Sequence, residues 1–75
     1  MPTATKAEIG ERMREARLRA GLSQVKLAAI LGITQNDVSR WECGRVTPGP
    51  HYRARISEAL DRPELFDDGE PEEPV

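Results

Sequence analysis

Two stretches with a helical pattern lie next to each other near the middle of this 75-residue chain, and only a few residues separate them. Ser23 precedes the first stretch and Thr34 precedes the second, and both are residue types that cap the N-terminus of a helix. Asp37 follows Thr34 at the spacing of a capping box. Gly32 lies between the stretches and can adopt a positive φ without steric cost. The sequence therefore predicts two short helices joined by a tight turn, which strongly limits how the chain can fold.

The apolar residues of this segment recur at helical spacing and predict which faces are buried. Ala28 is small at the point where the two helices must approach each other closely. Gly44 is expected to end the second helix, which we place over residues 34–43. The predicted inward-facing set is Leu27, Ala28, Leu31, Ile33, Val38 and Trp41. Two short helices packed in this way around a tight turn form a helix-turn-helix arrangement.

A further helical pattern precedes this segment. Thr5 and Glu8 have the spacing of a capping box, and Gly21 is a typical residue just beyond a helix end. These signals predict a helix near residues 6–20, with a charged outer face. Its expected inward-facing residues are Ile9, Met13, Ala16 and Ala20.

Another helix is predicted after the segment. Pro48 and Pro50 indicate a loop, and Pro50 also suits the first turn of a helix near residues 50–60. Residues 61–66 are expected to add one more short turn. The inward-facing residues of the predicted helix are Tyr52, Ile56, Ala59 and Leu60. Since no strand pattern is present, we predict an all-α fold, a compact bundle of four to five helices.

Size and composition exclude several classes of protein. A chain near this length buries only about 60% of the surface that its unfolded form exposes, so a binding protein fits better than an enzyme with its own cleft. No run approaches the roughly 18 apolar residues of a membrane span, and the N-terminus lacks the apolar run of a signal peptide. Cys43 is the single cysteine, which rules out an internal disulfide. We expect a cytoplasmic protein, bacterial or phage, without cofactor, metal, membrane partner or small-molecule ligand.

The net charge of −2 conceals two regions of opposite sign. All eleven Lys and Arg lie in residues 1–62 against seven Asp and Glu, which gives about +4. Residues 63–75 contain six Asp and Glu and no base, which gives −6. We therefore predict a domain over residues 1–66 and a disordered acidic tail over residues 67–75.

The combined spacing of several motifs is the most specific signal in the chain. The motifs are Ser23-Gln24-x-x-Leu27-Ala28, then Leu31-Gly32-Ile33-Thr34-Gln35, then Val38-Ser39-x-Trp41-Glu42-x-Gly44-x-x-x-Pro48. With them the chain resembles the Cro/repressor-type (XRE) helix-turn-helix family of phage repressors and bacterial regulators over roughly residues 7–62. The resemblance implies a lambda repressor-like bundle that binds duplex DNA with the helix at residues 34–43 in the major groove.

Applied to this chain, the resemblance predicts a set of DNA contacts. The expected base contacts are Gln35, Asn36, Ser39 and Arg40, with Ser39 also close to the sugar-phosphate backbone. The side-chain chemistry agrees independently, because Gln and Asn can pair with adenine and Arg can pair with guanine. The expected phosphate contacts are Gln24, Thr34 and Arg45. The resemblance also implies that Gln24 braces Gln35.

Other residues have structural interpretations. Arg17 and Glu42 occupy positions that form an ion pair in related proteins, and such a pair would orient the predicted recognition helix. Trp41 is interpreted as a core anchor and Cys43 as a small, semi-buried residue. His51 is expected at the surface. We expect the remaining basic side chains considered, Lys26, Arg14 and Arg53, to be solvated.

The first functional hypothesis is a sequence-specific regulator of transcription, of the Cro or immunity-repressor type, that blocks polymerase sterically. One helix contacts few base pairs, so a homodimer on an operator, palindromic in the simplest case, is expected. Its predicted contact surface consists of Leu60, Leu65 and Phe66, which could equally be core residues.

The alternative is a protein-interaction module, such as an antitoxin or adaptor built on the same fold. An enzyme is not expected, because no nucleophile–base pair, metal-binding set or phosphate loop occurs at usable spacing. Three roles stay open for the acidic tail: it hangs away from DNA, competes with DNA for the basic face, or recruits a protein.

Overall fold

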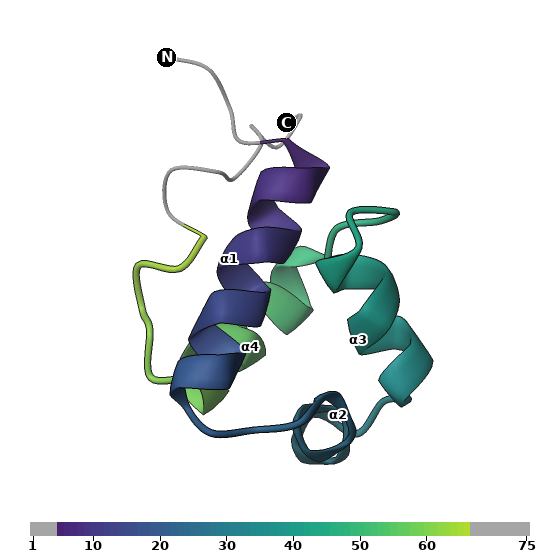
Figure 1. Cartoon of the computed structure of the whole chain (residues 1–75). Helices are drawn as coiled ribbons and strands as arrows, with labels where there is room; N and C mark the ends of the chain where they lie inside the picture. The colour runs from purple at the N-terminus through teal and green to yellow at the C-terminus, as the bar shows by residue number, and fades with distance from the viewer. Residues whose placement is uncertain (1–4, 67–75) are drawn as a thin grey trace.

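The computed structural model describes residues 5–66, which form four helices and no strand. The helices are α1 (Lys6–Arg19), α2 (Gln24–Leu31), α3 (Gln35–Glu42) and α4 (Pro50–Ala59) (Figure 1). The all-α prediction is confirmed, with four helices at the low end of the predicted range. The expected disorder of residues 67–75 lies outside the described residues.

Residues 61–66 form the short turn that the sequence predicts, and no fifth helix follows within the described part of the chain. Asp61 ends α4 with a left-handed φ of 58°, and Pro63 follows two residues later without a backbone N–H. The N–H of Leu65 then donates to the carbonyl of Arg62 at 3.0 Å. This single turn folds back on the bundle without extending into a helix.

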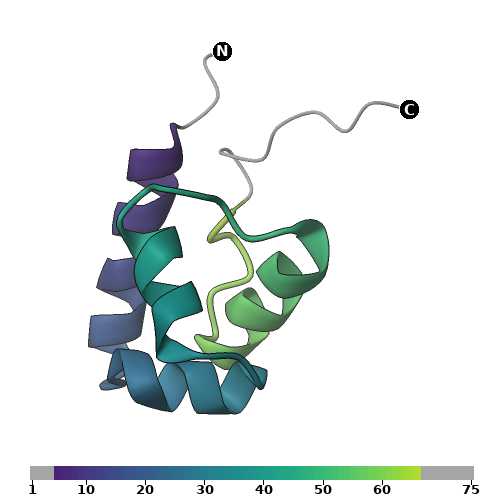
Figure 2. The same ribbon diagram turned by 90° about the vertical axis from the view of Figure 1, so that its right-hand side faces the viewer.

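The helices are arranged so that α3 lies on one side of the molecule and is open to solvent. Figure 2 shows α2 lying across the base of the bundle, with α3 standing above it and α1 and α4 on either side of α3. α3 packs against both α1 and α2, and α2 also packs against α4. The arrangement therefore places α3 against a support of other helices and leaves its opposite face free.

The helix starts are capped as the sequence predicts. The N–H of Thr5 donates to Oε1 of Glu8 at 2.8 Å, and the N–H of Glu8 donates back to Oγ1 of Thr5 at 3.1 Å. Ser23 accepts from the N–H of Lys26 at 3.0 Å. These bonds satisfy backbone donors that have no partner inside the helix, so they fix where α1 and α2 begin.

The turn between α2 and α3 depends on Gly32, which has φ of 73°. In this left-handed conformation the N–H of Ile33 donates to the carbonyl of Ala28 at 2.9 Å, the bond that closes a Schellman motif. A residue with a Cβ would be strained at this φ. The chain therefore changes direction at Gly32, and α3 begins directly after this turn.

A single apolar core holds the helices together. Met13, Leu27, Val38 and Ile56 are fully buried, and the ring centroids of Trp41 and Tyr52 lie 5.5 Å apart. The other buried core members are Ile9, Ala16, Ala28, Leu31, Trp41, Leu60, Leu65 and Phe66. The inward-facing predictions for α2 and α3 are therefore confirmed, except that Ile33 is only half-buried.

Several sequence-based expectations about burial are wrong. Ala20 is exposed, because it caps the C-terminus of α1 and lies beyond the packed part of the helix. Cys43 is also exposed, because it caps the C-terminus of α3, whereas the sequence predicts a semi-buried residue. Arg53 is 7% exposed where a solvated side chain was expected, because its Nε turns inward to the carbonyl of Pro48 at 3.0 Å. Tyr52 and Ala59, by contrast, do face inward as predicted, since both are half-buried and pack against the core.

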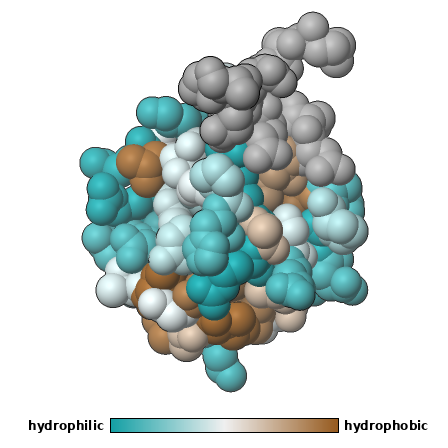
Figure 3. All heavy atoms as spheres, turned by 180° about the vertical axis from the view of Figure 1, so that it is seen from behind, coloured by the Kyte–Doolittle hydropathy of each residue, from teal (hydrophilic) through white to brown (hydrophobic). Residues whose placement is uncertain are grey.

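The predicted dimer contact surface is also corrected. Leu60, Leu65 and Phe66 have exposed fractions of 4%, 9% and 5% within a single chain. The turn after α4 folds these side chains into the core, where a second copy cannot reach them. Large apolar side chains that remain exposed include Val25 and Ile30 of α2. Seen from behind, hydrophobic surface gathers at the α2 end of the molecule (Figure 3).

Candidate nucleic-acid interface

The outer face of α3 carries a cluster of polar side chains. Gln35, Asn36 and Arg40 are exposed and Ser39 is half-buried. Their spacing of one, four and five residues puts them on one side of a helix. The opposite side is buried through Val38 and Trp41, with exposed fractions of 0% and 8%. Packing behind the helix therefore holds the polar face outward.

The start of α3 is fixed by a reciprocal cap. Oγ1 of Thr34 accepts from the N–H of Asp37 at 3.2 Å and donates to Oδ2 of Asp37 at 3.0 Å. The N–H of Thr34 lies 3.4 Å from the same Oδ2. Thr34 therefore acts first as a cap, which positions Gln35 and Asn36 in the first turn.

Gln24, the first residue of α2, reaches across to α3. Its Oε1 accepts from Nε2 of Gln35 at 3.0 Å, and its own Nε2 donates to Oε1 of Glu42 at 3.0 Å. The side chain is half-buried. The start of α2 and the first turn of α3 therefore share one hydrogen-bonded surface.

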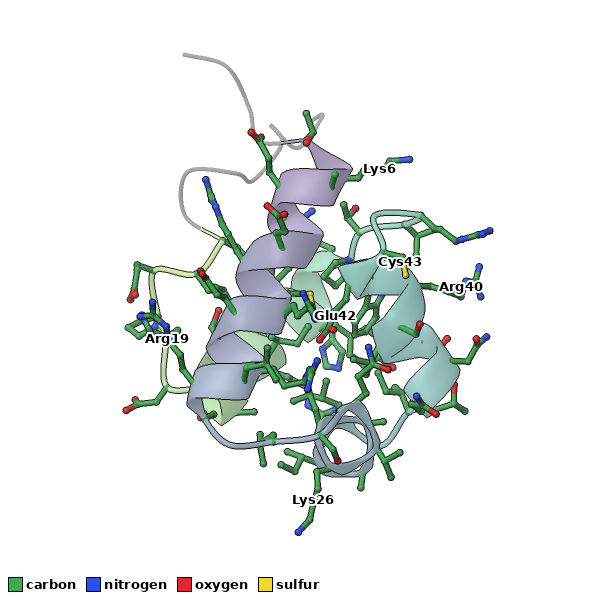
Figure 4. All side chains as sticks on the ribbon, viewed as in Figure 1. Lys6, Arg19, Lys26, Arg40, Glu42 and Cys43 are labelled. Atoms are coloured by element: carbon green, nitrogen blue, oxygen red, sulfur yellow. The ribbon has the colours of Figure 1, made fainter. Side chains whose placement is uncertain are left out.

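The C-terminal end of α3 places a second arginine beside the polar face. Gly44 has φ of 79°, and the N–H of Arg45 donates to the carbonyl of Arg40 at 3.0 Å. Arg45 is exposed. A shallow hollow of about 470 Å³ is lined by Asn36, Ser39, Arg40, Cys43 and Arg45. Arg40 points away from the body of the molecule, and Cys43 lies near it on α3 (Figure 4).

A buried ion pair connects α1 to α3 behind this surface. Nε of Arg17 lies 2.6 Å from Oε2 of Glu42, and its Nη2 donates to Oε1 at 3.1 Å. The two side chains are 8% and 3% exposed. Nη1 of Arg17 also donates to the carbonyl of Leu22 at 2.8 Å, so the same guanidinium also holds the loop between α1 and α2. Figure 4 shows Glu42 directed between α1 and α3, opposite to Arg40.

Three supporting residues were missed by sequence reasoning. Gly10 lies where α1 crosses the end of α3, and a Cβ there would be 2.5 Å from the carbonyl oxygen of Trp41. Arg55 donates from Nη1 to the carbonyl of Leu31 at 3.0 Å, at the end of α2. Arg53 holds the loop before α4, as described above. A glycine inside a strong helix pattern could have indicated the close approach; the two arginines carry no signal that separates them from surface residues.

The fold and this surface define a class. A helix with an exposed polar face, set by a tight turn against a preceding helix, is a helix-turn-helix domain. The chain belongs to the helix-turn-helix domain family, whose family model matches residues 8–66. This membership agrees with the prediction that the chain is not an enzyme.

A relative is found in Pyrococcus furiosus, where it is named "Putative HTH-type transcriptional regulatory protein". It is 37% identical to this chain over 54 residues, which is 72% of this chain. The matched region is 17% of the length of the relative. The similarity therefore concerns the helix-turn-helix domain and not the rest of that protein.

Two further observations concern the residues that the structure describes. None of the helices within residues 5–66 has the length and apolar character needed to span a membrane. Across the same residues, no group of three or more His, Cys, Asp or Glu side chains is placed to hold a metal ion.

Proposed function

We propose that this protein binds double-stranded DNA sequence-specifically and regulates transcription, as a small repressor of the Cro or immunity type. The observation that carries the proposal is the outer face of α3, with four polar side chains held outward by Val38 and Trp41. An α-helix with side chains is about 10–12 Å across, which matches the roughly 12 Å width of the major groove. Family membership and the name of the archaeal relative support the same function.

The polar face has the chemistry for base recognition. Gln35 and Asn36 are in the first turn of α3, where the N-terminal residues of a recognition helix meet base edges. An amide can pair bidentately with adenine, and the guanidinium of Arg40 can pair with guanine O6 and N7. Ser39 completes the face, one turn after Gln35 and Asn36.

The flanking groups suit the phosphate backbone. Gln24 begins α2, where unpaired N–H groups and the helix dipole favour an anion. Arg45 is exposed directly beyond α3, and Thr34 adds a polar group at its start. Residues 5–66 contain eleven Lys and Arg against eight Asp and Glu, which gives about +3 and favours approach to DNA.

Repression would be steric, since a domain bound at an operator excludes polymerase from the same stretch of duplex. An eight-residue recognition helix contacts few base pairs, so we propose two copies on adjacent half-sites of an operator. The contact between copies has to use surfaces other than Leu60, Leu65 and Phe66, which are buried. Selection of bound fragments from random duplex DNA would reveal inverted half-sites if this arrangement holds.

Two arginine variants test the proposal against the selected duplex. Arg40→Ala should cost about 1–3 kcal/mol of binding free energy and relax the preference at one base pair. Arg45→Ala should weaken binding to all sequences alike and reduce the slope of log K against log salt by about 1. Fluorescence anisotropy at several salt concentrations measures both effects.

Arg14→Ala is the matched control, because Arg14 is exposed on α1 and its replacement removes the same charge. It should leave the base preference unchanged. If the Arg40 and Arg45 variants both keep full affinity for every duplex tested, the assigned contacts are wrong. If the unmodified protein selects no duplex at all, the proposed function itself fails.

A further inference from the structure

We propose that Glu42, whose side chain is buried behind α3, is a positioning residue that makes Gln35 select adenine over guanine. The inference rests on the proposed function and deepens it. Its basis is the unbroken hydrogen-bond chain from Arg17 through Glu42 and Gln24 to Gln35, which connects a buried charge to the recognition face.

The first step of the chain is the carboxylate of Glu42. An ionised carboxylate can only accept hydrogen bonds. Both of its oxygens face Arg17, at 2.6 Å from Nε and 3.1 Å from Nη2. Because the Glu42 side chain is 3% exposed, water has little access to compete for it. Any amide that approaches this carboxylate has to present its NH₂ group.

The second step is Gln24, whose amide orientation follows from the first. Its Nε2 donates to Oε1 of Glu42 at 3.0 Å, so its carbonyl oxygen is directed toward α3. The opposite orientation would set that carbonyl oxygen against the carboxylate, and two acceptors repel each other. The charge of Glu42 therefore fixes which end of the Gln24 amide faces Gln35.

The third step transfers this polarity to the recognition face. Gln35 has to donate from Nε2 to Oε1 of Gln24, and it does so at 3.0 Å. One N–H of this amide is used, so its second N–H and its carbonyl oxygen remain for DNA. Gln35 thus presents one donor and one acceptor side by side.

This pair of groups matches one purine and not the other. In the major groove adenine offers the N7 acceptor and the N6 donor, whereas guanine offers two acceptors, N7 and O6. A reversed Gln35 amide would present two N–H groups and suit guanine. The buried charge of Glu42 therefore causes a preference for adenine at the base pair that Gln35 contacts.

The test is the base preference of Glu42→Gln. The amide oxygen of the new side chain would take the short contact with Nε of Arg17, which places its NH₂ toward Gln24 and removes the acceptor that Nη2 of Arg17 now has. Every amide in the chain would then reverse, and Gln35 would present two donors. We expect the unmodified protein to prefer adenine by about 5- to 150-fold at this base pair, and the variant to lose or reverse that preference.

The experiment starts from the duplex that the unmodified protein selects from random DNA. Gln35→Ala identifies the base pair that this residue contacts, as the one pair whose preference disappears. Affinities for the adenine and guanine versions of that pair are then compared for the unmodified protein, Glu42→Gln and Glu11→Gln. Glu11 is exposed on α1, so Glu11→Gln makes the same change of charge away from the chain of amides and should keep the adenine preference.

Gln24→Met keeps the proposal testable if Glu42→Gln does not fold, because it leaves the Arg17–Glu42 pair intact. It interrupts the chain without reversing it, so adenine and guanine should be bound about equally. Circular dichroism establishes that each variant is folded. A folded Glu42→Gln or Gln24→Met that keeps the full adenine preference overturns the inference. Failure of the unmodified protein to bind any duplex would instead overturn the proposed function.

Discussion

Gly10 lies in the interior of α1 at the point where this helix crosses the end of α3. A Cβ at this position would be 2.5 Å from the carbonyl oxygen of Trp41 and 2.6 Å from that of Glu42. Both neighbours are backbone atoms, which cannot move without displacing α3. The absence of a side chain therefore lets α1 approach closely enough for Arg17 to pair with Glu42.

Gly10→Ala should destabilise the domain, although helix propensity alone favours Ala over Gly by about 1 kcal/mol. Over-packing of this kind typically costs about 1–3 kcal/mol, and each kcal/mol lowers Tm by about 4–8 °C in a domain of this size. Thermal unfolding followed by circular dichroism measures the change. Gly49→Ala is the control, since no atom lies within 4 Å of the Cβ that it would add. A Tm that is unchanged or raised in Gly10→Ala would contradict the close approach.

The sequence predicts single residues well where helical periodicity decides their environment. Val38 and Trp41 were expected inside and Gln35, Asn36 and Arg40 outside, and the structure has them there. It fails where the environment depends on long-range packing. Leu65 and Phe66 could be core or interface residues, and only the turn after α4 decides for the core. Arg53 is buried because a loop carbonyl lies within reach of its guanidinium, which no local pattern indicates.

At the scale of elements, α2 has to be held firmly because it carries the turn that sets the angle of α3. Its start is capped by Ser23 and its end by Gly32. Arg55 of α4 adds a tertiary cap, with Nη1 3.0 Å from the carbonyl of Leu31 and Nη2 3.5 Å from that of Ile30. A guanidinium suits this place, since the C-terminus of a helix carries partial negative charge and unpaired carbonyls.

Arg55→Met should lower the free energy of unfolding by about 1–2 kcal/mol, because a half-buried charged hydrogen bond is lost while much of the side-chain volume is kept. Denaturant titration measures this loss. Amide hydrogen exchange should also become faster in this variant, with a larger increase in rate at the end of α2 than in α1. Arg14→Met removes an exposed arginine from α1 and should change stability by less than about 0.5 kcal/mol. Equal losses in the two variants would mean that Arg55 does not support α2.

The elements themselves were largely predictable from local signals. The capping residues Thr5, Ser23 and Thr34 precede the three helices that they were expected to start. The helix boundaries follow because a cap is a local hydrogen bond that needs no tertiary contact. The contact of Arg55 with α2 joins residues 24 positions apart, and the sequence contains no information about such a pair.

At the scale of the whole molecule, the chain places the proposed recognition surface on one side and the groups that support it behind it. The buried pair of Arg17 and Glu42, the Gln24 bridge and the close approach at Gly10 all act on the position of α3. The ion pair taken alone is weak evidence for stability, since burying its two charges costs desolvation free energy. Together these three contacts restrict the orientation of α3, which is what the proposed insertion of this helix into the major groove requires.

The most direct test of this account is a nuclear magnetic resonance titration of the labelled protein with its selected duplex. We predict the largest shifts at Gln35, Asn36, Ser39 and Arg40 and at the start of α2. The exposed side of α1, including Glu11 and Arg14, should change little. Shifts centred on α1 or α4, with the outer face of α3 unaffected at saturation, would contradict the claim that α3 is the DNA-recognition helix.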